Sequence, residues 1–281
     1  MKIVRTLSLS LSGLTALLTA IPAFASEMPG MADTGGMSVD HLLFLGVDVL
    51  NLAMIAASVI ILALVIGRYG ASELSTIFSS FIVAALLLGA CRLFIVFVNN
   101  GIIHISDDGM AMGWHIIFYL AMITFIMGAR SLVTLSKEGQ SAVTNKIILI
   151  WSVIVAVVTL LVFIFAAQID EAYMKIFGGT ALEAFGIIHF IAFLLAGIAA
   201  FYVFQRTKVG AVTKVLSTPL LIAIGFMSLQ HLWELLVESW KVIPIPSSMI
   251  EQVELIFVVP SYVLFAFAFL RLYRLVSRSA A

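Results

Sequence analysis

The amino-acid sequence predicts an all-α integral membrane protein with seven transmembrane helices after an N-terminal signal peptide. Of the 281 residues, 63% are hydrophobic and 11% are charged, whereas soluble globular domains have about 45–50% apolar and about 25% charged residues. Seven apolar stretches are each long enough to cross roughly 30 Å of hydrocarbon. This composition excludes a soluble enzyme, a disordered chain and a nucleic-acid binder with a basic face.

The first 25 residues have the layout of a secretory signal peptide. A basic start, Lys2 and Arg5, is followed by an apolar core and by the small-residue cleavage signal Ala23-Phe24-Ala25. We therefore expect residues 1–25 to be removed, although an uncleaved first helix is the alternative interpretation. Residues 26–41 then form a methionine-containing periplasmic segment, and residues 42–281 form a single seven-helix domain.

The seven predicted spans are almost wholly apolar in the halves expected to face the cytoplasm, and short connections join them. They lie near residues 42–66, 75–98, 112–132, 147–167, 182–204, 215–238 and 249–270. The connections contain turn-forming residues, as in Asn99-Asn100-Gly101 and Gly178-Gly179. No soluble domain fits between the spans, and the chain has no internal repeat of the kind found in inverted-repeat transporters.

The distribution of basic residues predicts the orientation in the membrane. With the N-terminus outside, ten lysines and arginines fall in the cytoplasmic segments, and only Lys175 and Lys241 fall in the outer loops. Cytoplasmic loops ordinarily carry this excess of positive charge. We therefore expect a bacterial inner-membrane protein with a periplasmic N-terminus and a cytoplasmic C-terminus.

Polar residues within the spans gather in the halves predicted to face the periplasm. They are Asp48, Asn51, Arg92, His115, Glu183, His189, Gln230, His231, Glu234, Glu238, Glu251 and Glu254. Ionisable groups at depth in a bilayer are costly and usually mark a binding site or a water-filled cavity. The sequence therefore predicts a polar cavity that opens to the periplasm above an apolar inner half.

The last two spans contain the residues that we predict as metal ligands. His231 and Glu234 are three residues apart and share a helix face, as do Glu251 and Glu254 on the next helix. Imidazole and carboxylate donors suit iron, manganese or zinc, and paired Glu-x-x-His motifs build di-iron sites in helical bundles. In this chain the histidine precedes the glutamate, and the motif occurs only once. We favour iron, with copper or zinc as alternatives; the competing interpretation is a set of hydrated helix ends.

Two further histidines and one arginine are candidate cofactor-binding residues. His115 and His189 could complete the same metal site, or two of the intramembrane histidines could ligate a haem b. Arg92 could then contact a haem propionate. The structural alternatives are a histidine that bonds a neighbouring helix and an arginine that extends to the membrane interface.

The segment before the first span offers a weaker hint of copper binding. Met28, Met31 and Met37 precede His41 within a glycine- and proline-containing stretch. Thioether sulfur is a soft ligand that favours Cu(I). The alternative interpretation is a flexible tail in which methionine has no ligand role.

Three functional hypotheses follow from these patterns. The leading one is a transition-metal site used in metal handling or redox chemistry, including a metal-dependent membrane oxidoreductase, with no catalytic residue assigned. The others are a haem b electron-transfer subunit and a non-catalytic sensor or assembly partner. Besides the lipid bilayer, a periplasmic or membrane redox partner fits the first two. The absence of a lysine from the last span excludes a retinal Schiff base there, and the chain contains no ATP-binding P-loop motif.

Overall fold

The computed structural model describes residues 39–69, 72–138, 144–177, 181–207, 211–245 and 247–278. Within these ranges all regular secondary structure is helical, and seven helices are long and apolar enough to cross a membrane. The predicted class, a seven-span helical membrane protein, is therefore confirmed. The predicted signal peptide and residues 26–38 of the methionine-containing segment lie outside the described residues.

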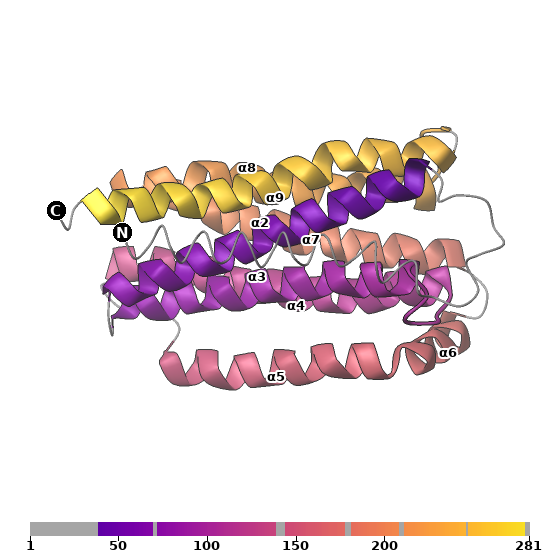
Figure 1. The fold of residues 1–281 in the computed structure, drawn as a ribbon, viewed down its shortest axis with the longest axis horizontal. Coiled ribbons are helices and arrows are strands. Elements are labelled where there is room, and N and C mark those ends of the chain that lie inside the picture. The colour runs from indigo at the N-terminus through magenta and orange to yellow at the C-terminus, as the bar shows by residue number, and fades with distance from the viewer. Residues whose placement is uncertain are drawn as a thin grey trace. The chain divides into compact units, whose positions relative to one another are not determined.

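The helices follow the predicted order along the chain (Figure 1). They are α2 (Val39–Tyr69), α3 (Glu73–Asn99), α4 (Asp107–Glu138), α5 (Asn145–Ile164), α6 (Ala166–Phe177), α7 (Ala181–Thr207), α8 (Ala211–Glu234), the π-helical turn η1 (Leu235–Ser239) and α9 (Ser247–Arg278). The apolar spans begin within four residues of the predicted positions, from Phe44–Arg68 for the first to Val253–Ser277 for the last. The sequence patterns did not predict α6 or η1.

Hydroxyl side chains define the beginnings of two of these helices. Ser72 and Ser75 form a capping box at the start of α3, in which each backbone N–H donates to the other residue's hydroxyl at 3.2 Å. At the start of α5, the Thr144 hydroxyl accepts a hydrogen bond from the backbone N–H of Ile147 at 3.3 Å. Both caps satisfy N–H groups that lack partners in the first turn of a helix.

The chain divides into two compact units, Met1–Ala53 and Met54–Ala281. The described part of the first unit is the N-terminal stretch of α2. The second unit contains the rest of α2 and all helices from α3 to α9, and it contains every residue of the candidate site described below.

In the second unit the helices pack against one another as a bundle. Helix α3 packs on α4, α4 on α7, α7 on α8, and α8 on α9, while α5 lies against α3 and α4 (Figure 1). Because successive spans run in opposite directions, α4 and α7 begin at the end of the bundle where α8 ends. We call this the site end.

The half of the bundle away from the site end has an aromatic core. Phe81, Phe125, Phe265 and Phe269 are fully buried there. The ring centroids of Phe81 and Phe125 are 4.9 Å apart, and those of Phe125 and Phe265 are 6.1 Å apart. These contacts join α3, α4 and α9, so this half of the bundle is closely packed and apolar.

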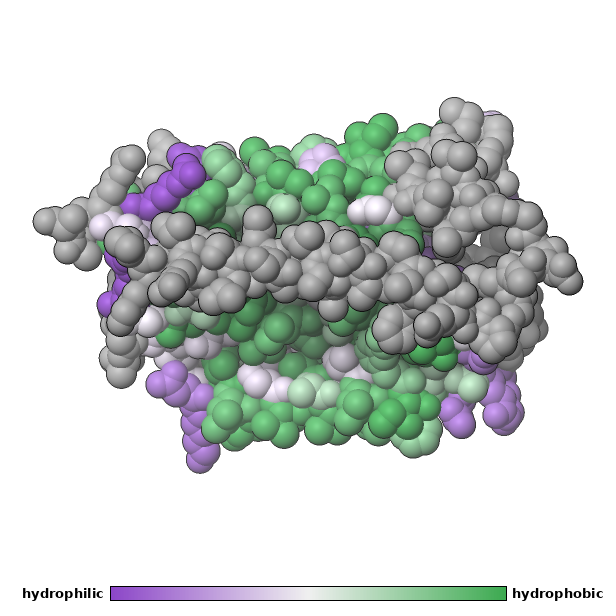
Figure 2. All heavy atoms as spheres, viewed as in Figure 1, coloured by the Kyte–Doolittle hydropathy of each residue, from purple (hydrophilic) through white to green (hydrophobic). Residues whose placement is uncertain are grey.

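Helix α5 presents most of its length to the surroundings of the bundle. Its exposed side chains include Leu149, Val153, Val157 and Leu160, whereas Val155 is buried. Figure 2 shows hydrophobic residues along the lower edge, where α5 lies in Figure 1, with hydrophilic residues at both ends of that edge. This is the surface expected of a helix that faces lipid.

Candidate metal centre

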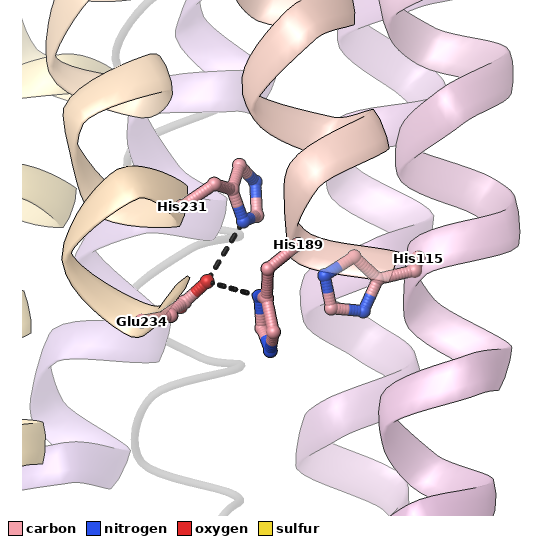
Figure 3. Close-up of side chains that lie close together, drawn as sticks. All are labelled: His115, His189, His231 and Glu234. Carbon is pink, nitrogen blue, oxygen red and sulfur yellow. Dashed lines mark hydrogen bonds and ion pairs between the residues drawn. The ribbon is translucent and has the colours of Figure 1, made fainter. Parts of the chain in front are cut away.

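Four buried side chains meet near the site end: His115 from α4, His189 from α7, and His231 and Glu234 from α8 (Figure 3). Each offers one ligand atom, and these atoms all lie within 4.8 Å of one another. None of the four residues is more than 4% exposed. We refer to this group as the four-residue site.

The helix ends place these side chains at the same depth. His115 and His189 are each the ninth residue of their helices, and both helices begin at the site end. His231 lies eight residues before Ser239, where η1 ends at the same end. Since a helix rises 1.5 Å per residue, all three histidines lie roughly 12 Å from that end. The three-residue spacing of His231 and Glu234 then directs both side chains to one face of α8, as predicted.

Glu234 connects the members of the site through both of its carboxylate oxygens. Oε2 lies 2.8 Å from Nδ1 of His231 and 2.7 Å from Nδ1 of His189. Oε1 accepts a hydrogen bond from Nε2 of Gln230 at 2.9 Å. One carboxylate oxygen thus faces two imidazole nitrogens, an arrangement that a shared proton or a metal ion can stabilise.

The orientation of His115 leaves one ring nitrogen available as a ligand. Its Nδ1 lies 2.6 Å from the carbonyl oxygen of Ala111, which can only accept, so Nδ1 carries the hydrogen. The opposite nitrogen, Nε2, therefore holds a lone pair, and among the described residues it has no hydrogen-bond partner. Leaving a buried acceptor unpaired costs free energy, and metal-ligating histidines commonly bond a carbonyl through their other nitrogen.

Aromatic rings pack around the imidazoles. The ring of Trp114 lies 3.8 Å from that of His115 and stacks on that of His231 at 5.5 Å between centroids. The ring of Phe118 meets His231 edge-on at 4.6 Å. These contacts restrict the rotamers of the imidazoles and exclude bulk water from one side of the site.

Arg92 lies beside the four-residue site without being one of its ligands. It lines a small cavity, large enough for about one water molecule, together with Gln230, His231 and Tyr262. Its Nε donates a hydrogen bond to the Tyr262 hydroxyl at 3.2 Å, and its guanidinium lies 5.2 Å from the centre of the Tyr262 ring. Arg92 therefore links α3 to α9 next to His231.

The structure selects among the predicted neighbours of His231 and Glu234. The sequence paired them with Glu251 and Glu254 and gave His115 and His189 as further candidates for the same site; the structure brings them together with His115 and His189. Glu254 lies on α9 and is not one of the four, and the side chain of Glu251 lies outside the described residues. Gln230 and Trp114, which the sequence did not assign to the site, contact it directly. The polarity of Gln230 within a span and its spacing of four residues from Glu234 are the signals that could have identified it.

Scans of protein-family models, curated proteins and solved structures find no match to this chain. Three imidazoles and one carboxylate are donors that iron, zinc and other first-row transition metals accept.

Proposed function

We propose that this polytopic membrane protein binds one divalent transition-metal ion, iron in the first place, at the four-residue site. The bound ion serves redox or related metal chemistry at the membrane. The observation that carries this proposal is the convergence of four buried side chains whose ligand atoms lie within 4.8 Å of one another. Nε2 of His115 also has no hydrogen-bond partner among the described residues.

The spacing of the donors supports the binding of a single ion. Nitrogen and oxygen ligands lie about 2.0–2.2 Å from a metal such as zinc, so two ligands of one ion are at most about 4.4 Å apart. A bound ion would need the most distant donors to close slightly from the 4.8 Å limit. It would also need Oε2 of Glu234 and the histidine nitrogens, which lie 2.7–2.8 Å apart, to separate to ligand spacing. No sulfur belongs to the site, and Cys91 instead hydrogen-bonds the carbonyl of Trp114. A nitrogen and oxygen donor set favours iron or zinc over Cu(I).

The packing around the site supports an ion rather than a haem. The ring centroids of His115 and His189 are 4.7 Å apart, and those of His115 and His231 are 5.4 Å apart. Trp114 and Phe118 fill the adjacent space. A haem held between two of these histidines would have to displace those rings.

The aromatic core supports a retained ion rather than a transported one. An ion that crossed the bundle would have to pass the buried rings of Phe81, Phe125 and Phe265, which offer no ligand atoms. Moving a bare cation through such surroundings is costly. The apolar core therefore favours a site-bearing protein over a channel.

The charge bias of the loops supports an orientation for the site. Ten basic residues fall on one side and two on the other, and the site end lies on the side with two. We therefore propose that the site faces the periplasm of a bacterial inner membrane.

Metal content, measured on protein purified in detergent without a histidine tag, tests this function. Elemental analysis should find about one iron or zinc per chain in the wild type, and none in a variant with His231→Ala and Glu234→Ala, because two of the four ligands are lost. The matched control is His104→Ala, an exposed histidine in the connection before α4, which should keep the metal.

Three other outcomes of this measurement would contradict the proposed metal site. Unchanged metal in the double variant would overturn the assignment of the site. A Soret band in the visible spectrum that disappears in that variant would select the haem b alternative. Neither metal nor absorption after growth with metals supplied would favour a sensor or assembly role.

A further inference from the structure

Glu238 lies between the buried site and the surroundings of the protein. Its Oε2 is 3.9 Å from Nε2 of His189, and 36% of its side chain is exposed, against 4% for His189. The other nitrogen of the same ring, Nδ1, lies 2.7 Å from the buried carboxylate of Glu234. One imidazole ring therefore lies close to a partly exposed carboxylate on one edge and a buried carboxylate on the other.

The π-helical turn η1 carries Glu238 immediately beyond Glu234. The turn closes with a hydrogen bond from the N–H of Trp240 to the carbonyl of Leu235 at 2.8 Å, five residues apart. Single π-turns within α-helices frequently occur at functional sites. Here the wide turn allows two carboxylates four residues apart to approach the same histidine of α7 from different sides.

A buried metal site needs a route by which a hydrated cation loses its water in steps. None of the residues of the four-residue site is more than 4% exposed, so a cation in solution cannot reach them directly. An exposed carboxylate attracts a cation, raises its local concentration and can replace part of its hydration shell. Glu238 lies beside His189 and is partly exposed, so it can take up a hydrated cation next to the buried ligands.

We propose that Glu238 is the loading carboxylate of the metal site: it captures a divalent cation at the surface and passes it to His189 and Glu234. This inference rests on the proposed function, because it requires an ion at the four-residue site. A group that only eases passage speeds both binding and release, whereas a ligand that only stabilises the bound ion slows its release.

The test compares the rates of loading and release in the intact protein. Metal-free protein in detergent is mixed with Co²⁺, whose absorption reports binding, and release is then started with excess chelator. Glu238→Gln should slow both loading and release by about tenfold and should weaken the salt dependence of loading. The matched control is Glu171→Gln on α6, an exposed carboxylate paired with Lys175 at 2.6 Å, which should leave both rates unchanged.

The remaining outcomes overturn the proposal in distinguishable ways. Faster release from Glu238→Gln would assign Glu238 as a stabilising ligand, and unchanged rates would remove it from the pathway. If wild-type protein binds no Co²⁺, Zn²⁺ or Fe²⁺, the proposed function fails together with this inference. If the wild type binds the ion and only the rates of the variant contradict the expectation, the proposed function remains.

Discussion

At the scale of single residues, Gln230 orients the carboxylate of Glu234 toward the two histidines. Its amide holds Oε1 of the carboxylate at 2.9 Å, while Oε2 faces the two imidazoles. Gln230 is itself buried, so its amide cannot exchange this bond for one to bulk water. A hydrogen bond of this kind orients a ligand and sustains the affinity of the site.

Replacing Gln230 with alanine should therefore weaken metal binding without removing a ligand. We expect a loss of about 10- to 100-fold in affinity, the range typical of residues that orient metal ligands. Equilibrium titration with Zn²⁺ against a competing chelator measures it. Gln168→Ala on α6, an exposed glutamine, is the control, and equal affinities for the two variants would contradict the role given to Gln230.

At the scale of helices, the spans were predictable and the connections between them were not. A run of about 20 apolar residues is a strong local signal, so spans such as Glu73–Asn99 were located to within a few residues. That His231 and Glu234 share one face of α8 also follows from their three-residue spacing alone. The partnership with His115 and His189 depends on which helices become neighbours, and η1 depends on packing, so neither is encoded in a local pattern.

The two faces of α5 provide a prediction about helix packing. Val155 is 1% exposed and Val157 is 50% exposed, although they have the same chemistry and lie two residues apart. Val155→Ala should destabilise the protein by about 1–2 kcal/mol, because it leaves a cavity between helices. Val157→Ala should have little effect, since lipid or detergent fills the space.

Thermal unfolding in detergent, followed by circular dichroism, measures this difference. A lower melting temperature for Val155→Ala than for Val157→Ala is the expected result. Equal melting temperatures would mean that α5 does not pack against α3 and α4 as described.

At the scale of the whole molecule, the loop charges predict how the chain lies in the membrane. Ten basic residues on one side against two on the other should place the C-terminus in the cytoplasm. A fluorescent protein fused after Ala281 should therefore mature and fluoresce. An alkaline phosphatase inserted after Asn100, in the connection between α3 and α4, should be active because that connection faces the periplasm. The reverse pattern of activities would show the opposite orientation.

The position of the four-residue site also determines how strongly it senses the voltage across the membrane. His115 lies six residues into the span Gly109–Leu135, about 9 Å along a helix of about 39 Å. A divalent ion that reaches the site from the nearer surface thus crosses roughly a quarter of the field, worth about 1 kcal/mol at 100 mV against about 4.6 kcal/mol for a full crossing. Collapse of a 100 mV potential should therefore change the affinity of the site by only about fivefold, whereas an ion that crossed the whole field would feel a change of more than about a thousandfold.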